Sequence, residues 1–277
     1  GKGMAQASRI AAVSRIVWVR ACWQEKPHSS FGPCEIRPLD GLRPTSPHMA
    51  AGMRMEPPPS LAAEDIRNEK VKLLKSIRPM TPEAVAKNVV RGQYFAGTVN
   101  DDSREGYRQE ERVNPESNVE TFVALKLFID NWRWSGVPFY LRTGNNLPLK
   151  ASEVRVQFRP TPNVLFAAQG DLDLDRNALT LRLQPDEGIS LLVNGKVPGT
   201  TIARRPVRMH FGYDAEFGAY TPEAYERLLL EAMAGDATLF IRRDEVETAW
   251  QFVDAIRAGW GGEALSNREF YAAGTWG

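Results

Sequence analysis

The sequence predicts an α+β fold: a large, mostly antiparallel sheet with helices packed on one face. Two observations support this prediction. Segments in the middle of the chain alternate apolar and polar residues, which is typical of antiparallel strands with one packed face. Segments with helical periodicity are gathered before and after this strand-rich middle, an order typical of α+β domains.

Residues 1–54 show no sustained period. Arginines and prolines are scattered through this segment, and only Ile10 to Val19 is apolar enough for a short helix or strand. Such a composition is compatible with a flexible tail or with a reading-frame error. We therefore divide the chain into an incoherent segment, 1–54, and a domain, 55–277.

Helix signals begin directly after Met55. Pro57 to Pro59 forces an extended entry, and Ser60 offers an N-cap for a helix that runs to about Ser76. Thr81-Pro82-Glu83 predicts a second helix start, because it combines a capping hydroxyl, a proline at the first helical position and an acid at the positive end of the dipole.

The strand-rich middle follows. Two segments are more apolar and β-branched than the others and are expected to be more deeply buried, namely Val119 to Asp130 and Val137 to Leu141. Three others alternate and are expected to pack on one face: Glu153 to Arg159, Ala178 to Gln184 and Pro206 to Gly212. Asn194-Gly195 predicts a tight turn.

Two helices are expected in the C-terminal part. Thr221-Pro222-Glu223 repeats the capped helix start, and Gly235 supplies a left-handed stop. Asp244 is expected to cap the second helix, which carries an apolar stripe that includes Trp250 and Val253.

Composition excludes several classes of function. A formal net charge of +1 gives no electrostatic argument for nucleic acid. No stretch approaches the ~20 consecutive apolar residues that a membrane span needs. Cys22 and Cys34 lack C-x-x-C spacing, so we expect neither a disulfide framework nor a metal site, and a cytoplasmic location.

The sequence also lacks the motifs of the common catalytic sites. It contains no G-x-G-x-x-G or G-x-x-x-x-G-K-[ST] turn for a dinucleotide or nucleotide. Of its histidines, His28 and His48 lie in the incoherent segment, and His210 is expected on the polar face of a strand, where a partly exposed structural role is far more frequent than catalysis. We therefore predict no catalytic residue and no metal ligand.

An ordered set of motifs nevertheless resembles the glucose-6-phosphate dehydrogenase family. The central one is Gly136-Val-Pro-Phe-Tyr-Leu-Arg-Thr-Gly144, with Leu147 and Lys150 after it. The others, in chain order, are Met55-Glu-Pro-Pro, Asp65 to Val71, Val90 to Tyr94, Gly106-Tyr107, Ser117, Glu120 to Phe122, Trp134, Ala224 to Leu228, Asp244-Glu245, Ala249-Trp250 and Ala273 to Gly277.

The resemblance implies an oxidoreductase that converts glucose 6-phosphate to 6-phosphogluconolactone with NADP, at the start of the pentose phosphate pathway. It implies an N-terminal Rossmann domain for NADP, which has no counterpart here, and a C-terminal α+β domain whose sheet forms homo-oligomers. The Arg-Ile-Asp-His-Tyr-Leu-Gly-Lys stretch, in which the family has its catalytic histidine, is also absent. We therefore expect this chain alone to be inactive.

The change from incoherent sequence to sequence that matches the family is abrupt near Arg54, which favours a frameshift over a divergent tail. We also expect the chain to be cut at both ends. A non-catalytic dimerisation or interaction module is the alternative function, and a pseudogene product without a stable role is a weaker one.

The same resemblance implies a site for the sugar phosphate. In the family two cations of one loop help to hold it; here the second matches Lys150, whereas the first is Asn145, which carries no charge. The alternative interpretation of Lys150 is a solvated lysine before a strand, without a role in binding. Arg142 is interpreted as a residue that shapes the loop, whereas Arg155 and Arg182 are expected to be solvated on polar strand faces. Trp132 and Trp134 are expected in packing or at an interface, since no basic groove accompanies them.

Overall fold

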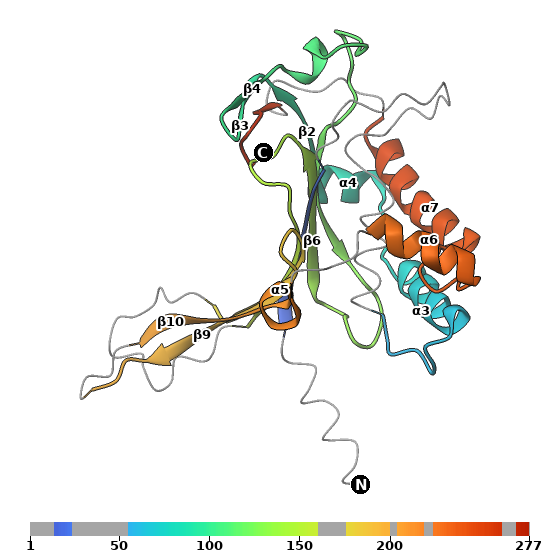
Figure 1. The fold of residues 1–277 in the computed structure, drawn as a ribbon. Helices are drawn as coiled ribbons and strands as arrows, with labels where there is room; N and C mark the ends of the chain where they lie inside the picture. Colours follow the sequence, from blue (N-terminus) through green and yellow to red (C-terminus); the bar gives the residue numbers. More distant parts are fainter. Residues whose placement is uncertain are drawn as a thin grey trace.

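The computed structural model describes residues 14–23, 55–159, 176–199, 204–218, 224–261 and 270–276. Their architecture is α+β, as predicted: a large sheet carries helices on one side (Figure 1). Among these residues, no helix is long and apolar enough to cross a membrane.

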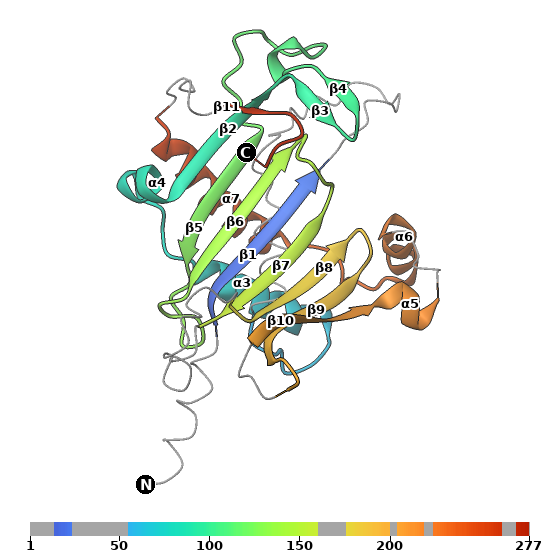
Figure 2. The same ribbon diagram turned by 90° about the vertical axis from the view of Figure 1, so that its left-hand side faces the viewer.

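Within the described residues the sheet has nine strands, in the order β10-β9-β8-β7-β1-β6-β5-β2-β11 (Figure 2). Their bounds, in chain order, are β1 Ser14–Trp23, β2 Val89–Phe95, β5 Phe122–Phe128, β6 Pro138–Asn145, β7 Ser152–Phe158, β8 Ala178–Gln184, β9 Gly188–Lys196, β10 Arg204–Gly212 and β11 Phe270–Ala272. Two neighbouring pairs are parallel, β1 with β6 and β11 with β2, and the others are antiparallel. The prediction of a mostly antiparallel sheet is confirmed.

Strand β1 comes from the segment 1–54. It lies between β6 and β7 (Figure 2), parallel to the first and antiparallel to the second, so that Val17 pairs with both Phe139 and Val156. The sequence allowed a short helix or strand over Ile10 to Val19, and the strand runs further, to Trp23.

The described helices are α3 Ala63–Lys75, α4 Pro82–Asn88, α5 Tyr213–Phe217, α6 Ala224–Ala234 and α7 Arg243–Gly259. Figure 1 shows α3, α6 and α7 together on one side of the sheet. Directly after β2, near one end of the sheet, the chain forms a small hairpin and a 3₁₀ turn (Figure 1). The hairpin pairs β3 Gly97–Val99 with β4 Asp102–Arg104, and the turn is η2 Tyr107–Gln109.

The predicted helix starts are confirmed in one case and wrong in two. The Thr81 hydroxyl accepts a hydrogen bond from the Ala84 N–H, as a capping residue does. Helix α3 instead begins after Ala62. The Ser60 hydroxyl lies before the helix, where it accepts from the Ala62 N–H and donates to the Asp65 carboxylate of the first turn.

Helix α7 begins after Arg242, slightly earlier than the predicted cap at Asp244. The Asp244 carboxylate accepts hydrogen bonds from the Arg242 guanidinium, at 2.7 and 2.9 Å, which lowers its pKa. Its charge therefore lies inside the first turn, where the helix dipole favours an anion.

Two other turn predictions have different outcomes. Gly235 ends α6 with a φ of 71°, the left-handed conformation predicted for it. Asn194 and Gly195 do not form a turn, because both pair with β10 inside a continuous strand, opposite Pro206 and Arg205. The third helix start, Thr221-Pro222-Glu223, lies outside the described residues.

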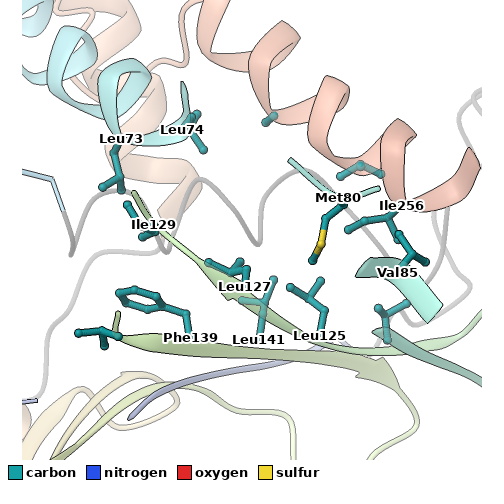
Figure 3. Packing of buried hydrophobic residues seen from close by; sticks show 14 of the residues in the cluster. Leu73, Leu74, Met80, Val85, Leu125, Leu127, Ile129, Phe139, Leu141 and Ile256 are labelled. Atoms are coloured by element: carbon teal, nitrogen blue, oxygen red, sulfur yellow. The ribbon is translucent and has the colours of Figure 1, made fainter. Parts of the chain in front are cut away.

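The main core lies between the helices and the centre of the sheet (Figure 3). Leu125 and Leu127 of β5 and Phe139 and Leu141 of β6 face the helices and are buried, which confirms that these two strands are the deeply buried ones. Their helical partners are Leu73 and Leu74 of α3, Val85 of α4, and Ala249, Val253 and Ile256 of α7. The sheet centre is thereby fixed against three helices.

Strand β10 departs from the expected burial. Val207 and Met209 were predicted on a packed face, but their exposed fractions are 41% and 52%. The reason is its place in the sheet: β10 is the edge strand, and the main core beneath the helices includes none of its described residues. The apolar face of this edge is therefore open to solvent in the chain by itself.

Candidate functional site

The two residues predicted to bind the sugar phosphate lie on one loop, between β6 and β7. Asn145 is the last residue of β6 and is half-buried, and Lys150 is exposed two residues before β7 begins. The Lys150 ammonium forms no ion pair or hydrogen bond with the described residues, so it faces solvent. This loop, residues 145–150, is called the phosphate loop below.

The phosphate loop is fixed at its centre by a buried side chain. Leu147 has an exposed fraction of 1% and belongs to a second apolar cluster with Phe122, Tyr94 and Tyr271. Gly144, just before the loop, passes so close to the Phe122 ring that a Cβ there would lie 2.8 Å from Cδ2. The two candidate ligands therefore flank an anchored residue.

Hydrogen bonds hold the main chain at the start of the loop. The Asn145 N–H donates to the Thr121 carbonyl at 2.9 Å, and the Asn145 carbonyl accepts from the Tyr271 hydroxyl at 2.8 Å. The next carbonyl, that of Asn146, accepts from the Gly274 N–H at 2.8 Å. Because Tyr271 and Gly274 belong to the C-terminal segment of the chain, this distant segment supports the phosphate loop.

The C-terminal motif needs its glycine. Gly274 has a φ of +84°, and a Cβ there would lie 1.7 Å from the Thr98 carbonyl oxygen. The left-handed backbone and the close approach both require a residue without a side chain. This explains physically why a glycine stands between Ala273 and Thr275.

Arg142 lies just before the loop, among aromatic rings. Its Cζ is 5.3 Å from the ring centre of Phe122 and 5.6 Å from that of Trp276. Contacts of this kind hold a guanidinium by cation–π attraction. They agree with the interpretation of Arg142 as a residue that shapes the loop.

Tyr94 is another tyrosine of the same cluster. Burial raises the pKa of its phenol above the ordinary value, because the phenolate would lose its hydration, and the neighbouring Glu110 raises it further. Its hydroxyl donates to the Glu110 carboxylate. Tyr94 therefore remains neutral and serves as a hydrogen-bond donor that supports the cluster.

The other residues named from the sequence lie apart from the loop. Arg155 pairs in register with Thr180, and Arg182 with Glu153, on the polar face of β7 and β8. His210 is exposed on β10, opposite Ser190, as expected of a sheet-face histidine. Trp134 packs on Phe139 in the core, with ring centres 5.3 Å apart, whereas the Trp132 side chain is fully exposed.

The described residues do not fit the principal binding site of a dinucleotide. Such a site places the pyrophosphate at a helix that starts at a glycine-rich turn after a parallel strand. Helices α3, α4, α5 and α7 do not start in this way. We assign no step to NADP in this chain. Among the described residues there is also no group of three or more metal-binding side chains.

The family model described as "Glucose-6-phosphate dehydrogenase, C-terminal domain" matches residues 48–277. The chain belongs to this family. The match begins slightly before Met55, where the sequence signals begin, and it includes the phosphate loop.

Relatives support the same assignment to the glucose-6-phosphate dehydrogenase family. The chain is 48% identical to the glucose-6-phosphate 1-dehydrogenase of Chlamydia trachomatis over 210 residues, 75% of this chain and 47% of that protein. It is 43% identical to that of Bacillus subtilis over 212 residues, 76% of this chain and 43% of the relative. The chain thus spans about half the length of these curated relatives.

Solved structures of the family have the same fold. One, a glucose-6-phosphate dehydrogenase in complex with its substrate glucose 6-phosphate, aligns with a TM-score of 0.76 and 29% identity over 98% of this chain and 55% of the other. A glucose-6-phosphate 1-dehydrogenase from Mycobacterium avium aligns with a TM-score of 0.74 and 27% identity, also over 98% of this chain and 55% of the other.

Sequence reasoning missed Thr121 and Tyr271, which hold the loop. Both belong to segments that carried the family resemblance or adjoin them, but nothing in their spacing connects them with residue 145. Their role follows from the pairing of β11 with β2, which brings the end of the chain against Gln93, Tyr94 and Phe95.

Proposed function

We propose that this domain binds the phosphate of glucose 6-phosphate in an NADP-dependent dehydrogenase that forms 6-phosphogluconolactone and opens the pentose phosphate pathway. The observation that carries the proposal is the phosphate loop: an exposed lysine at the end of a loop whose other end is pinned by main-chain hydrogen bonds. A related solved structure holds glucose 6-phosphate as its substrate.

The chemistry of Lys150 suits this role. An ammonium group is a compact point charge with three donors on a flexible stem, and such groups bind phosphate in many proteins. Because Lys150 is exposed and no carboxylate among the described residues neutralises it, its charge is available to a dianionic ligand. Asn145 supplies a hydrogen-bond donor without a charge.

We further propose that this chain by itself does not oxidise the sugar. The family resemblance places the catalytic histidine and the NADP site in stretches that this sequence does not contain. The proposed role is therefore binding of the phosphate, with the chemistry supplied by a coenzyme-binding half.

Titration with glucose 6-phosphate, followed by amide chemical shifts, tests the binding role. We expect saturable shifts in residues 145–150, weaker binding by about tenfold or more in Lys150→Ala, and no change in Lys75→Ala. The tenfold loss of affinity in Lys150→Ala corresponds to the loss of one charge-assisted contact. Lys75 is an exposed lysine of α3 and serves as the matched control. Equal affinity of the two variants would contradict the proposal, and titration with glucose shows how much of the binding needs the phosphate.

A homo-oligomer formed through the sheet is the second candidate role, and the exposed apolar side chains of Val207 and Met209 on the edge strand favour it. Exposed patches of this kind often mark interfaces. Sedimentation velocity measures it directly: a dimer is expected, and a monomer at all concentrations would contradict it.

A further inference from the structure

Four residues form a hydrogen-bonded chain that ends at the phosphate loop. The Tyr94 N–H donates to the Thr121 hydroxyl at 3.0 Å, the Thr121 hydroxyl lies 3.1 Å from the Tyr271 hydroxyl, and the Tyr271 hydroxyl donates to the Asn145 carbonyl at 2.8 Å. Each hydroxyl has one proton to donate. All three contacts are satisfied together when Thr121 donates to Tyr271 and Tyr271 donates to Asn145.

The first two hydrogen bonds of this chain are buried, and the third, from Tyr271 to Asn145, is partly buried. The exposed fractions of Tyr94, Thr121 and Tyr271 are 4%, 0% and 7%. Water therefore cannot readily replace a missing partner of the Thr121 hydroxyl, and a buried hydrogen bond is stronger where the local dielectric constant is low. The geometry of these groups is correspondingly well determined.

The same groups hold the Asn145 residue from both sides. The Asn145 N–H donates to the Thr121 carbonyl while the Asn145 carbonyl accepts from Tyr271. The Tyr271 hydroxyl also lies 3.2 Å from the Thr121 carbonyl, a more distant second acceptor for the same proton. Rotation of the Asn145 backbone would change the direction of the loop that leads to Lys150, and it must break these contacts.

The Tyr271 ring has its own packing, independent of the hydroxyl. Its centre lies 5.5 Å from that of Phe122 and 6.1 Å from that of Tyr94. Aromatic contacts at these distances stabilise the cluster without the oxygen. A phenylalanine at this position keeps the packing and removes only the hydrogen bonds.

We propose that Tyr271 is a positioning residue for sugar-phosphate binding: its hydroxyl fixes the main chain of Asn145 and thereby the direction in which Asn145 and Lys150 present their donors. The inference rests on the proposed function, since it assigns a role to Tyr271 in that same site. It makes the C-terminal strand β11, whose Tyr271 lies 126 positions after Asn145, a part of the binding site without touching the ligand.

Tyr271→Phe tests the inference in the full chain. We expect its affinity for glucose 6-phosphate to fall roughly two- to tenfold, the range that corresponds to one neutral hydrogen bond. We also expect hydrogen exchange of the Asn145 amide to accelerate, while that of Val253 in α7 stays unchanged. Tyr107→Phe is the matched control, because Tyr107 packs on Tyr94 in the same cluster and lies on η2, apart from the loop.

The outcomes separate the inference from the proposed function. If Lys150→Ala weakens binding and Tyr271→Phe binds like the wild type, Tyr271 is not a positioning residue although the binding role stands. If Tyr107→Phe loses as much affinity as Tyr271→Phe, the effect is a general loosening of the cluster and the inference is wrong. If Lys150→Ala binds as tightly as the wild type, the proposed function fails, and the positioning role fails with it.

Discussion

Asn145→Lys is expected to raise the affinity of the chain for glucose 6-phosphate by roughly ten- to a hundredfold. The substitution adds a second cation to the loop that carries Lys150, and one charge-assisted contact with a phosphate contributes about 1.5–3 kcal/mol. The loop itself should not change, because its anchors at residue 145 are main-chain groups: the N–H bonded to Thr121 and the carbonyl bonded to Tyr271.

The measurement is a titration with glucose 6-phosphate at two salt concentrations. Leu149→Lys is the control, since it places the same charge on an exposed position of the same loop. The gain should be larger at position 145 and should shrink at high salt, because exposed charges are screened. Equal gains at the two positions would show a general charge effect, and no gain at residue 145 would contradict its place in the site.

Phe139→Ala is expected to lower the free energy of unfolding by about 3–5 kcal/mol, the usual cost of removing a buried aromatic side chain. Phe139 has no exposed surface, lies on β6 in the main core (Figure 3) and packs against the Trp134 ring. A typical domain has only about 5–15 kcal/mol of stability, so the loss takes a large part of it.

Urea denaturation followed by circular dichroism measures this loss. Phe217→Ala serves as the comparison, because Phe217 on α5 is largely exposed and its truncation should change stability by about 0.5 kcal/mol or less. Similar urea midpoints of unfolding for the two variants would mean that the Phe139 side chain of β6 is not part of the core between the sheet and the helices.

The sequence was sufficient for the layers of the fold because periodicity reports burial directly. The more apolar, β-branched segments predicted the buried centre of the sheet, and Phe139 and Leu127 lie there. Local capping chemistry was reliable at Thr81, where a single hydroxyl and its own helix decide the outcome. It failed at Ser60 and Asp244, because each side chain has a competing partner, Asp65 in one case and Arg242 in the other.

Features that depend on distant segments were not predictable in this way. Alternation at Val207 and Met209 predicted a packed face, but an alternating strand at a sheet edge has the same pattern as one in the middle. Asn194-Gly195 has the composition of a turn, yet both residues continue β9 because β10 pairs alongside them. The role of Tyr271 depends on a contact with residue 145, which no local pattern contains.

The candidate site was predictable only through resemblance. Composition and spacing gave no reason to single out Lys150, because a lysine before a strand is usually only solvated. The motif from Gly136 to Gly144 placed it in a loop of the family, and the structure adds the main-chain anchors of that loop. Its binding role stays a prediction until a ligand is titrated.

The central proposal is that this chain binds the phosphate of the sugar and does not by itself transfer the hydride. The most direct measurement is the absorbance of NADPH when the purified chain is incubated with glucose 6-phosphate and NADP, with saturation of the sugar phosphate verified in the same sample. We predict that glucose 6-phosphate binds and that no NADPH forms above the background without protein. Steady formation of NADPH that depends on both glucose 6-phosphate and the chain would contradict the claim.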